Sequence, residues 1–142
     1  MPHLQHKSQN LHLAGPVIEV IIVPPQPVIE NLKAKGQPVP VQKAIALIDT
    51  GATCTCIDKT IAQGLNLVSH DIKRVQTAGG EDMQCLYDAG VILPLAQNAI
   101  FSVQVLEAKL EKQPYKVLLG RDVLRRCTLV YNGWDNSYTL HL

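Results

Sequence analysis

The sequence has little charge and no surplus of either sign. Charged residues make up 18% of its 142 positions, and 13 Lys and Arg against 12 Asp and Glu leave a formal net charge of +1. Proteins that bind nucleic acid through phosphate contacts carry a basic face, and acidic tails carry blocks of like charge. The composition argues against both classes, so we expect no nucleic-acid partner.

Long apolar runs are also missing. No run approaches the roughly 20 residues that a helix needs to cross a bilayer. Residues 1–10 are polar and lack the basic-then-apolar order of a signal peptide. We therefore expect no membrane partner and a cytoplasmic location.

Cysteine is scarce, with four residues. Cys54 and Cys56 flank Thr55, whereas Cys85 and Cys127 lie far away in the sequence. A Cys-x-Cys pair can begin a metal site, but no second pair or nearby His completes one. We expect buried or half-buried free thiols and no bound metal.

The residues that are abundant favour β structure. Apolar residues make up 46% of the chain, strong helix formers do not dominate, and nine Pro and nine Gly punctuate short runs of Val, Ile and Thr. The length suits one domain with a sizeable core. We expect that domain at residues 16–142, after a flexible N-terminal tail at residues 1–15 that holds solvated histidines.

The pattern along the chain predicts mainly strands. Asp58 is expected to cap a short helix at residues 59–64, and Arg121 or Asp122 to open a second. Mixed connectors are expected at 28–40 and 108–115. The expected strands are 16–23, 41–48, 53–57, 66–75, 83–95, 99–106, 116–120, 128–131 and 137–142, with turns at 77–82 and at Asn132-Gly133.

One stretch, Ala46-Leu47-Ile48-Asp49-Thr50-Gly51-Ala52, places a carboxylate directly after an apolar strand. An ionised carboxylate among apolar side chains must be hydrogen-bonded, paired or protonated. Thr50 supplies a hydroxyl, and Gly51 permits close approach of another backbone. The simplest interpretation is a turn, which Asp and Gly often form. The alternative is a functional carboxylate on a loop that a rigid strand positions.

A second informative stretch runs from Lys116 to Cys127. Its apolar strand stops at Gly120, and Arg121-Asp122 leads into a short helix with Val123, Leu124 and Cys127 on one side. The two charges either form a surface pair at a helix start or brace the loop that carries Asp49.

These stretches, about seventy residues apart and in this order, resemble the retropepsin-like aspartic proteases from about Pro16 to the end of the chain. Residues 46–57 are similar to the retroviral active-site segment, and residues 117–124 to its Gly-Arg-Asp/Asn helix. Residues 77–80, followed by 83–93, resemble the flap of bacterial members. The resemblance implies an all-β, retropepsin-like acid protease half-barrel with one or two short helices, closed by homodimerisation.

Aspartic proteolysis needs two carboxylates that share a proton and activate a water molecule. The chain has one Asp-Thr-Gly, so the resemblance implies a homodimer in which each subunit contributes Asp49. Thr50 would then link the two loops, and Gly51 would present its backbone to a polypeptide substrate. Because water is the nucleophile, no cofactor or metal is implied.

Supporting roles follow from the same resemblance. Asp122 is expected to bond toward Thr55, beside Gly120. Arg121 normally pairs with an acidic residue near the active-site turn, but Thr53 and Cys54 occupy those positions here, so another partner is expected. Ala52 stands where pepsin-like enzymes carry Ser or Thr, which predicts activity at weakly acidic to near-neutral pH.

Substrate is expected to lie as an extended strand between two flaps and the paired loops. The residues expected to contact it are Ala52, Cys56, Ile57, Thr77, Ala78, Gly79 and Gly80. The C-terminal strand 137–142 is the expected dimer contact. Two alternatives stay open: an inactive dimer of the same fold that binds a peptide or protein, and a structural β domain with a chance motif.

Overall fold

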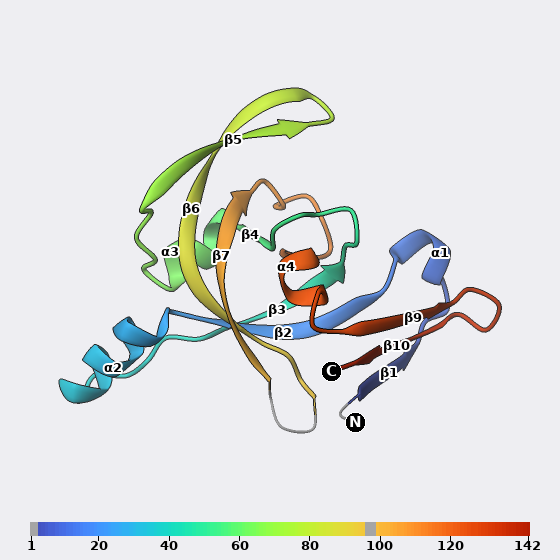
Figure 1. Ribbon diagram of the computed structural model, residues 1–142, viewed down its shortest axis with the longest axis horizontal. Coiled ribbons are helices and arrows are strands. Elements are labelled where there is room, and N and C mark those ends of the chain that lie inside the picture. Colours follow the sequence, from blue (N-terminus) through green and yellow to red (C-terminus); the bar gives the residue numbers. More distant parts are fainter. Residues whose placement is uncertain (1–2, 96–98) are drawn as a thin grey trace.

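A computed structural model describes residues 3–95 and 99–142, and these form ten strands and four helices (Figure 1). The predicted β class is confirmed. The strands are β1 (His3–Lys7), β2 (Val17–Val23), β3 (Gln42–Ile48), β4 (Cys56–Asp58), β5 (Asp71–Thr77), β6 (Gly80–Ile92), β7 (Ile100–Ala108), β8 (Val117–Leu119), β9 (Thr128–Asn132) and β10 (Ser137–His141). The helices are α1 (Leu11–Ala14), α2 (Gln26–Ala34), α3 (Lys59–Gly64) and α4 (Arg121–Leu124).

Seven strands form one curled sheet in the order β2-β3-β8-β4-β7-β6-β5. The curl brings β2 back onto β6, where Ile21 pairs with Ile92 and Val23 with Gly90. The ring therefore closes within one protomer, and β5 extends from it. Gly90 permits this contact, because a Cβ there would lie 2.7 Å from Val23 Cγ2.

The core lies inside this ring. β2 alternates between buried residues, such as Ile18 and Val20, and more exposed ones, as a strand with one covered face should. β4 and β8 contribute Ile57, Val117 and Leu119, each 0% exposed. Burying these side chains is the main force that curls the sheet.

β3 and β8 run parallel, with Ile48 opposite Leu119. Parallel strands bring their carboxyl ends to the same edge, so the residues that follow Ile48 and Leu119 meet there. This edge therefore joins the two stretches that the sequence singles out.

The remaining three strands form a small antiparallel sheet in the order β1-β10-β9. Residues 3–7 and 11–14, which lie within the stretch expected to be a flexible tail, form β1 and α1, and Leu11 of α1 is 1% exposed. β10 has a hydrogen-bonded neighbour on each side, so it does not offer the exposed edge expected of the C-terminal strand. The Tyr138 hydroxyl donates to the Val17 carbonyl oxygen and fastens this sheet to the ring.

The two predicted helices are present. Asp58 caps α3, because its carboxylate accepts a hydrogen bond of 3.1 Å from the Thr60 N–H. α2 lies where the sequence predicted part of a connector, and that expectation is wrong. Prolines after residue 23 end the preceding strand, but Pro27 also stands in the first turn of α2, where proline needs no hydrogen-bonded N–H.

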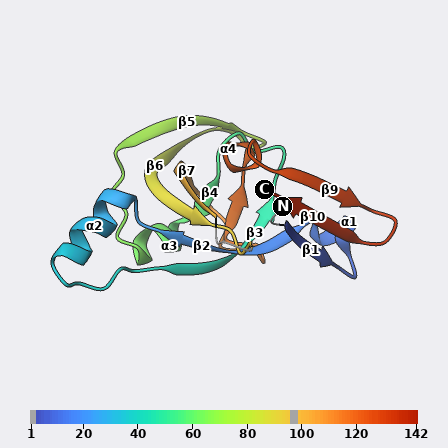
Figure 2. The same cartoon turned by 60° about the horizontal axis from the view of Figure 1, so that its bottom comes forward.

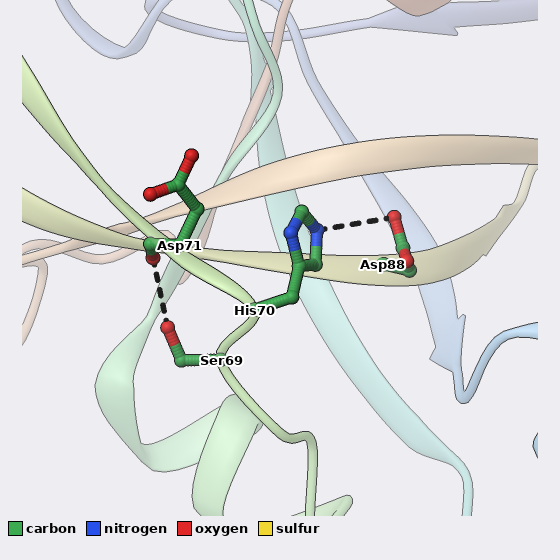
Figure 3. A network of polar contacts seen from close by, with 4 residues as sticks. All are labelled: Ser69, His70, Asp71 and Asp88. Atoms are coloured by element: carbon green, nitrogen blue, oxygen red, sulfur yellow. Dashed lines mark hydrogen bonds and ion pairs between the residues drawn. The ribbon is translucent and has the colours of Figure 1, made fainter.

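β5 and β6 form a long hairpin that arches away from the ring over the side that carries α4 (Figures 1 and 2). Thr77 pairs with Gly80, so the turn is only Ala78-Gly79, shorter than the expected turn at 77–82. At its base, His70 Nε2 lies 3.3 Å from Asp88 Oδ1, and Ser69 donates to the Asp71 carbonyl oxygen (Figure 3). Such exposed polar contacts add little stability.

Among the described residues, no helix has the length and apolar character needed to cross a bilayer.

Candidate active site

Asp49 directly follows β3 and is held by backbone hydrogen bonds. Its N–H donates to the Leu119 carbonyl oxygen at 3.0 Å, which ties the loop to β8. Its carboxylate Oδ1 accepts a hydrogen bond of 2.9 Å from the Gly51 N–H. A Cβ at Gly51 would come within 3.1 Å of that oxygen, so glycine suits this close turn. The orientation of the carboxylate is therefore set by backbone rather than by a mobile side chain.

Thr55 links this loop to α4. It is 0% exposed, and its hydroxyl donates to Asp122 Oδ1 at 2.7 Å while accepting from the Gly120 N–H at 3.1 Å. The Thr55 N–H donates to Asp122 Oδ2 at 3.0 Å. Both carboxylate oxygens of Asp122 are thus used, and the predicted Thr55–Asp122 contact is present.

Gly120 allows this close packing. A Cβ at this position would lie 2.5 Å from the Cys54 carbonyl carbon and 2.8 Å from the Thr55 nitrogen. No side-chain carbon fits at such distances, and the neighbours are backbone atoms that cannot swing aside. Glycine is therefore needed at position 120 because a side chain has no room there, and not because the backbone adopts an unusual angle.

Arg121 finds the alternative partner that the sequence called for. Its Nη1 donates to the Thr50 carbonyl oxygen at 2.7 Å, and its Nη2 donates to Thr53 Oγ1 at 3.1 Å. Its backbone N–H donates to the Ala52 carbonyl oxygen at 2.8 Å. Arg121 therefore braces the loop through carbonyl and hydroxyl oxygens instead of a carboxylate.

Cys56 lies close enough to the site for the charges there to affect the pKa of its thiol. Burial, followed by Cys54, Asp122 and Asp49, raises the pKa of the Cys56 thiol to about 11. The thiol is therefore protonated at neutral pH, and its sulfur donates a weak hydrogen bond to the Cys54 carbonyl oxygen at 3.6 Å. All four cysteines are half-buried free thiols, as expected.

Among the described residues, the Asp49 carboxylate accepts a hydrogen bond only from Gly51 of its own turn. Asp122 braces Thr55, and Asp58 is 3% exposed and bonded to Thr60 and to the Leu110 N–H. Asp49 is only half-buried, and Thr50 and Gly51 beside it are exposed. Within the part of the chain that the structure describes, the Thr50 hydroxyl has no hydrogen-bond partner. The loop thus presents a carboxylate and a spare hydroxyl to its surroundings.

The other predicted contact residues divide into three groups. Ala52 and Cys56 are partly accessible near Asp49. Ile57 is 0% exposed and packs in the core, so the expectation that it contacts substrate is not met in this structure. Ala78 and Gly79 form the exposed turn of the β5–β6 hairpin, beside Gly80, and the side chain of Thr77 lies outside what the structure describes.

One feature beside the site was not predicted. A concave surface of about 310 Å³ adjoins the loop at Thr50. We call it the α4 pocket; it is lined by Thr50, Arg121, Leu124, Arg125, Cys127 and Leu129. The sequence signal for it is the apolar side of the short helix, from which Leu124 and Cys127 line the pocket while Val123 is buried.

Solved structures resemble this fold. A retropepsin-like aspartic protease from Rickettsia conorii is 17% identical, with a TM-score of 0.51 over 88% of this chain and 91% of that one. Simian foamy virus (mac) protease is 20% identical, with a TM-score of 0.49 over 78% of this chain and 92% of that one. None of the curated proteins matches the chain by sequence.

A family model described as "gag-polyprotein putative aspartyl protease" matches residues 36–126. The match includes the Asp49 loop, the β5–β6 hairpin and α4, and it spans more than half of the 142 residues. The chain therefore belongs to the gag-polyprotein aspartyl protease family, and its fold is that of the retropepsin-like proteases.

Proposed function

We propose that the chain is an aspartic endopeptidase that acts as a homodimer with one catalytic Asp49 per subunit. The observation that carries the proposal is that the accessible Asp49 carboxylate is held in a fixed orientation on a braced loop. Its carboxylate is oriented by the Gly51 N–H, its loop is braced by Arg121, and Asp122 braces the adjoining Thr55. A turn with no function would not need bracing of this kind around an accessible carboxylate.

A second copy completes the site. A two-fold axis beside Thr50 and Gly51 brings Asp49 against the partner's Asp49, and the two carboxylates then share one proton because like charges in contact cannot both ionise. The free Thr50 hydroxyl is suited to donate across the axis to the partner loop. The homodimer thus uses the accessible Asp49 carboxylate and the Thr50 hydroxyl, which has no hydrogen-bond partner among the described residues of one protomer.

The dyad hydrolyses a peptide bond without a cofactor. The ionised Asp49 takes a proton from a water molecule, whose oxygen attacks the scissile carbonyl carbon. The protonated Asp49 gives its proton to the carbonyl oxygen, and a tetrahedral intermediate forms. Transfer of a proton to the amide nitrogen then breaks the C–N bond and releases an acid and an amine.

The substrate is an extended polypeptide, because strand-like main-chain contacts suit a site between a loop and a hairpin. The β5–β6 hairpin serves as a flap whose Ala78-Gly79 turn closes over the substrate. Ala52 and the uncharged thiol of Cys56 favour apolar substrate side chains. We also propose a cytoplasmic location, where reducing conditions preserve free thiols such as the four found here.

Cleavage of a mixed peptide library tests the activity. The wild type should cleave, Asp49→Ala should be inactive, and Glu111→Gln, which alters an exposed carboxylate in a connector, should match the wild type. A pepstatin-type inhibitor should stop the wild type. Background levels of product from both the wild type and Asp49→Ala would reject the protease and leave the inactive binding dimer.

Ala52 provides a second test of the same mechanism. Ala52→Thr adds a hydroxyl donor that stabilises the ionised dyad, so the pH optimum for peptide cleavage should move toward acid. Ala52→Val has a similar shape without the hydroxyl and should leave the optimum unchanged. An equal shift in both variants would contradict this role.

A further inference from the structure

The small sheet ends in an unprotected strand. In the order β1-β10-β9, β10 lies in the middle, so β9 has one edge without a hydrogen-bonded strand among the described residues. β9 contains no Lys and no Pro, and its Val130 and Tyr131 are each 49% exposed. A strand edge without charge or proline tends to pair with another chain.

The hairpin tip beyond β9 carries an isolated aromatic side chain. Trp134 is 99% exposed and is the one tryptophan of the sequence. The β9–β10 hairpin extends beyond the ring in both views (Figures 1 and 2). In this state the indole exposes a large apolar area to water. Tryptophan is also among the residues that most often dominate the binding energy of protein interfaces.

The α4 pocket has the chemistry to accept such a side chain. Leu124, Cys127 and Leu129 supply apolar contact, and Arg121 and Arg125 supply cations. A cation over an indole face is favourable. Asp135, which follows Trp134 and accepts a hydrogen bond from the Ser137 hydroxyl, has the charge that complements Arg125.

We propose that the edges of β9 from two copies pair antiparallel and that Trp134 of each copy enters the α4 pocket of its partner. The inference rests on the proposed function, because the dimer is the one that brings the two Asp49 residues together. With the two-fold axis at Val130, Asn132 lies opposite the partner's Thr128, and the tip that carries Trp134 continues toward the partner's α4. The partner's Thr128 lies between the partner's Cys127 and Leu129, which line the pocket.

The contact would join dimer formation directly to the catalytic loop. Thr50 lines the α4 pocket and also precedes Gly51, whose N–H orients Asp49. A tryptophan in the pocket would therefore pack against the loop at Thr50. The hairpin lies beyond residues 36–126, which the family model matches, whereas Thr50, Arg121, Leu124 and Arg125 of the pocket lie within them.

Because Trp134 is the one tryptophan, its fluorescence reports on the interface in the full-length wild-type protein. As protein concentration rises through the dimerisation range found by sedimentation, its emission should shift to the blue and become protected from acrylamide. Trp134→Ala should weaken dimerisation by about 30-fold or more. Trp134→Phe should recover part of this loss, and Val68→Ala, which alters another exposed apolar residue, should change nothing.

A charge exchange tests the orientation of the contact. Arg125→Glu and Asp135→Lys should each weaken the dimer, and the double variant should recover much of the affinity. A protein that dimerises and cleaves peptides while Trp134 stays fully accessible to acrylamide would overturn this inference and leave the proposed function standing. A protein that neither dimerises nor cleaves would overturn both, and losses that simply add in the double variant would exclude the Asp135–Arg125 pairing.

Discussion

The Thr55 hydroxyl donates a 2.7 Å hydrogen bond to Asp122, a residue 67 positions further along the chain. The same carboxylate accepts from the Thr55 N–H, so one aspartate fixes both the backbone and the side chain of a fully buried residue. Bonds to a charged group in such a setting are strong. This pair joins the two halves of the site.

Asp122→Ala should therefore destabilise the protein by about 3 kcal/mol, because it leaves the buried Thr55 donors without a partner. Urea unfolding measures the loss. Thr55→Val should also be costly, and the double variant should lose less than the sum of the two single losses. Glu111→Ala, on an exposed connector, should stay within about 0.5 kcal/mol of the wild type. If the double variant lost the sum of the two single losses in unfolding free energy, the Thr55–Asp122 contact would contribute no interaction energy.

Gly120→Ala should be destabilising by at least about 2 kcal/mol, because the added methyl group meets the Cys54 backbone at 2.5 Å. Thermal unfolding followed by circular dichroism measures this. Gly133→Ala is the matched control, since a Cβ there meets Tyr131 at an ordinary 3.6 Å. Similar melting temperatures for the two variants would contradict the spatial argument.

Thr53→Asp should stabilise the protein by about 0.2–1 kcal/mol, the range expected for an exposed ion pair. The new carboxylate would replace the Thr53 hydroxyl that Arg121 Nη2 now contacts. The gain should shrink in high salt, because exposed charge pairs are screened. Thr53→Asn has the same shape without the charge and should give no gain. Equal stability of the Asp and Asn variants at low salt would argue against the pairing.

The ionisation of Asp58 should make the stability of the protein depend on pH in the acid range. Burial alone would raise the pKa of this carboxyl, but hydrogen bonds from Thr60 and Leu110, together with the charge of Lys116, lower it overall from 3.8. The stability that the ionised group contributes is therefore present above pH 3.8 and is lost as the pH falls through the lowered folded value.

Asp58→Asn keeps a helix-capping side chain but cannot ionise. Its free energy of unfolding should be well below that of the wild type near about pH 7, and the difference should become smaller at about pH 3. Urea unfolding at both pH values measures the difference. A gap of the same size at both would contradict the lowered pKa.

Secondary structure could be predicted well wherever several local signals agree. The apolar strand before Asp49, the Asp58 cap of α3 and the short helix after Gly120 are all specified by neighbouring residues, so they could be read directly. Proline misled the prediction at residues 26–34. A proline in the first turn of a helix and a proline that ends a strand look alike until the surrounding backbone is known.

Long-range contacts were visible from the sequence only through the family resemblance. That resemblance anticipated the Thr55–Asp122 contact, but not the turn of Arg121 toward Thr50 and Thr53, nor the burial of Ile57. It also could not show that β10 is enclosed by β1 and β9, because strand order depends on which edges meet after the chain has folded.

The sequence by itself determined the β class, the Asp-Thr-Gly turn at Asp49 and the Gly-Arg-Asp stretch that supports it, because each depends on residues close together in the chain. Only the tertiary structure decided that β3 and β8 lie parallel and bring Asp49 beside Gly120, and that Trp134 and the α4 pocket are both left open. Those relations follow from strand register and from the burial of side chains far apart in sequence, which local patterns do not encode.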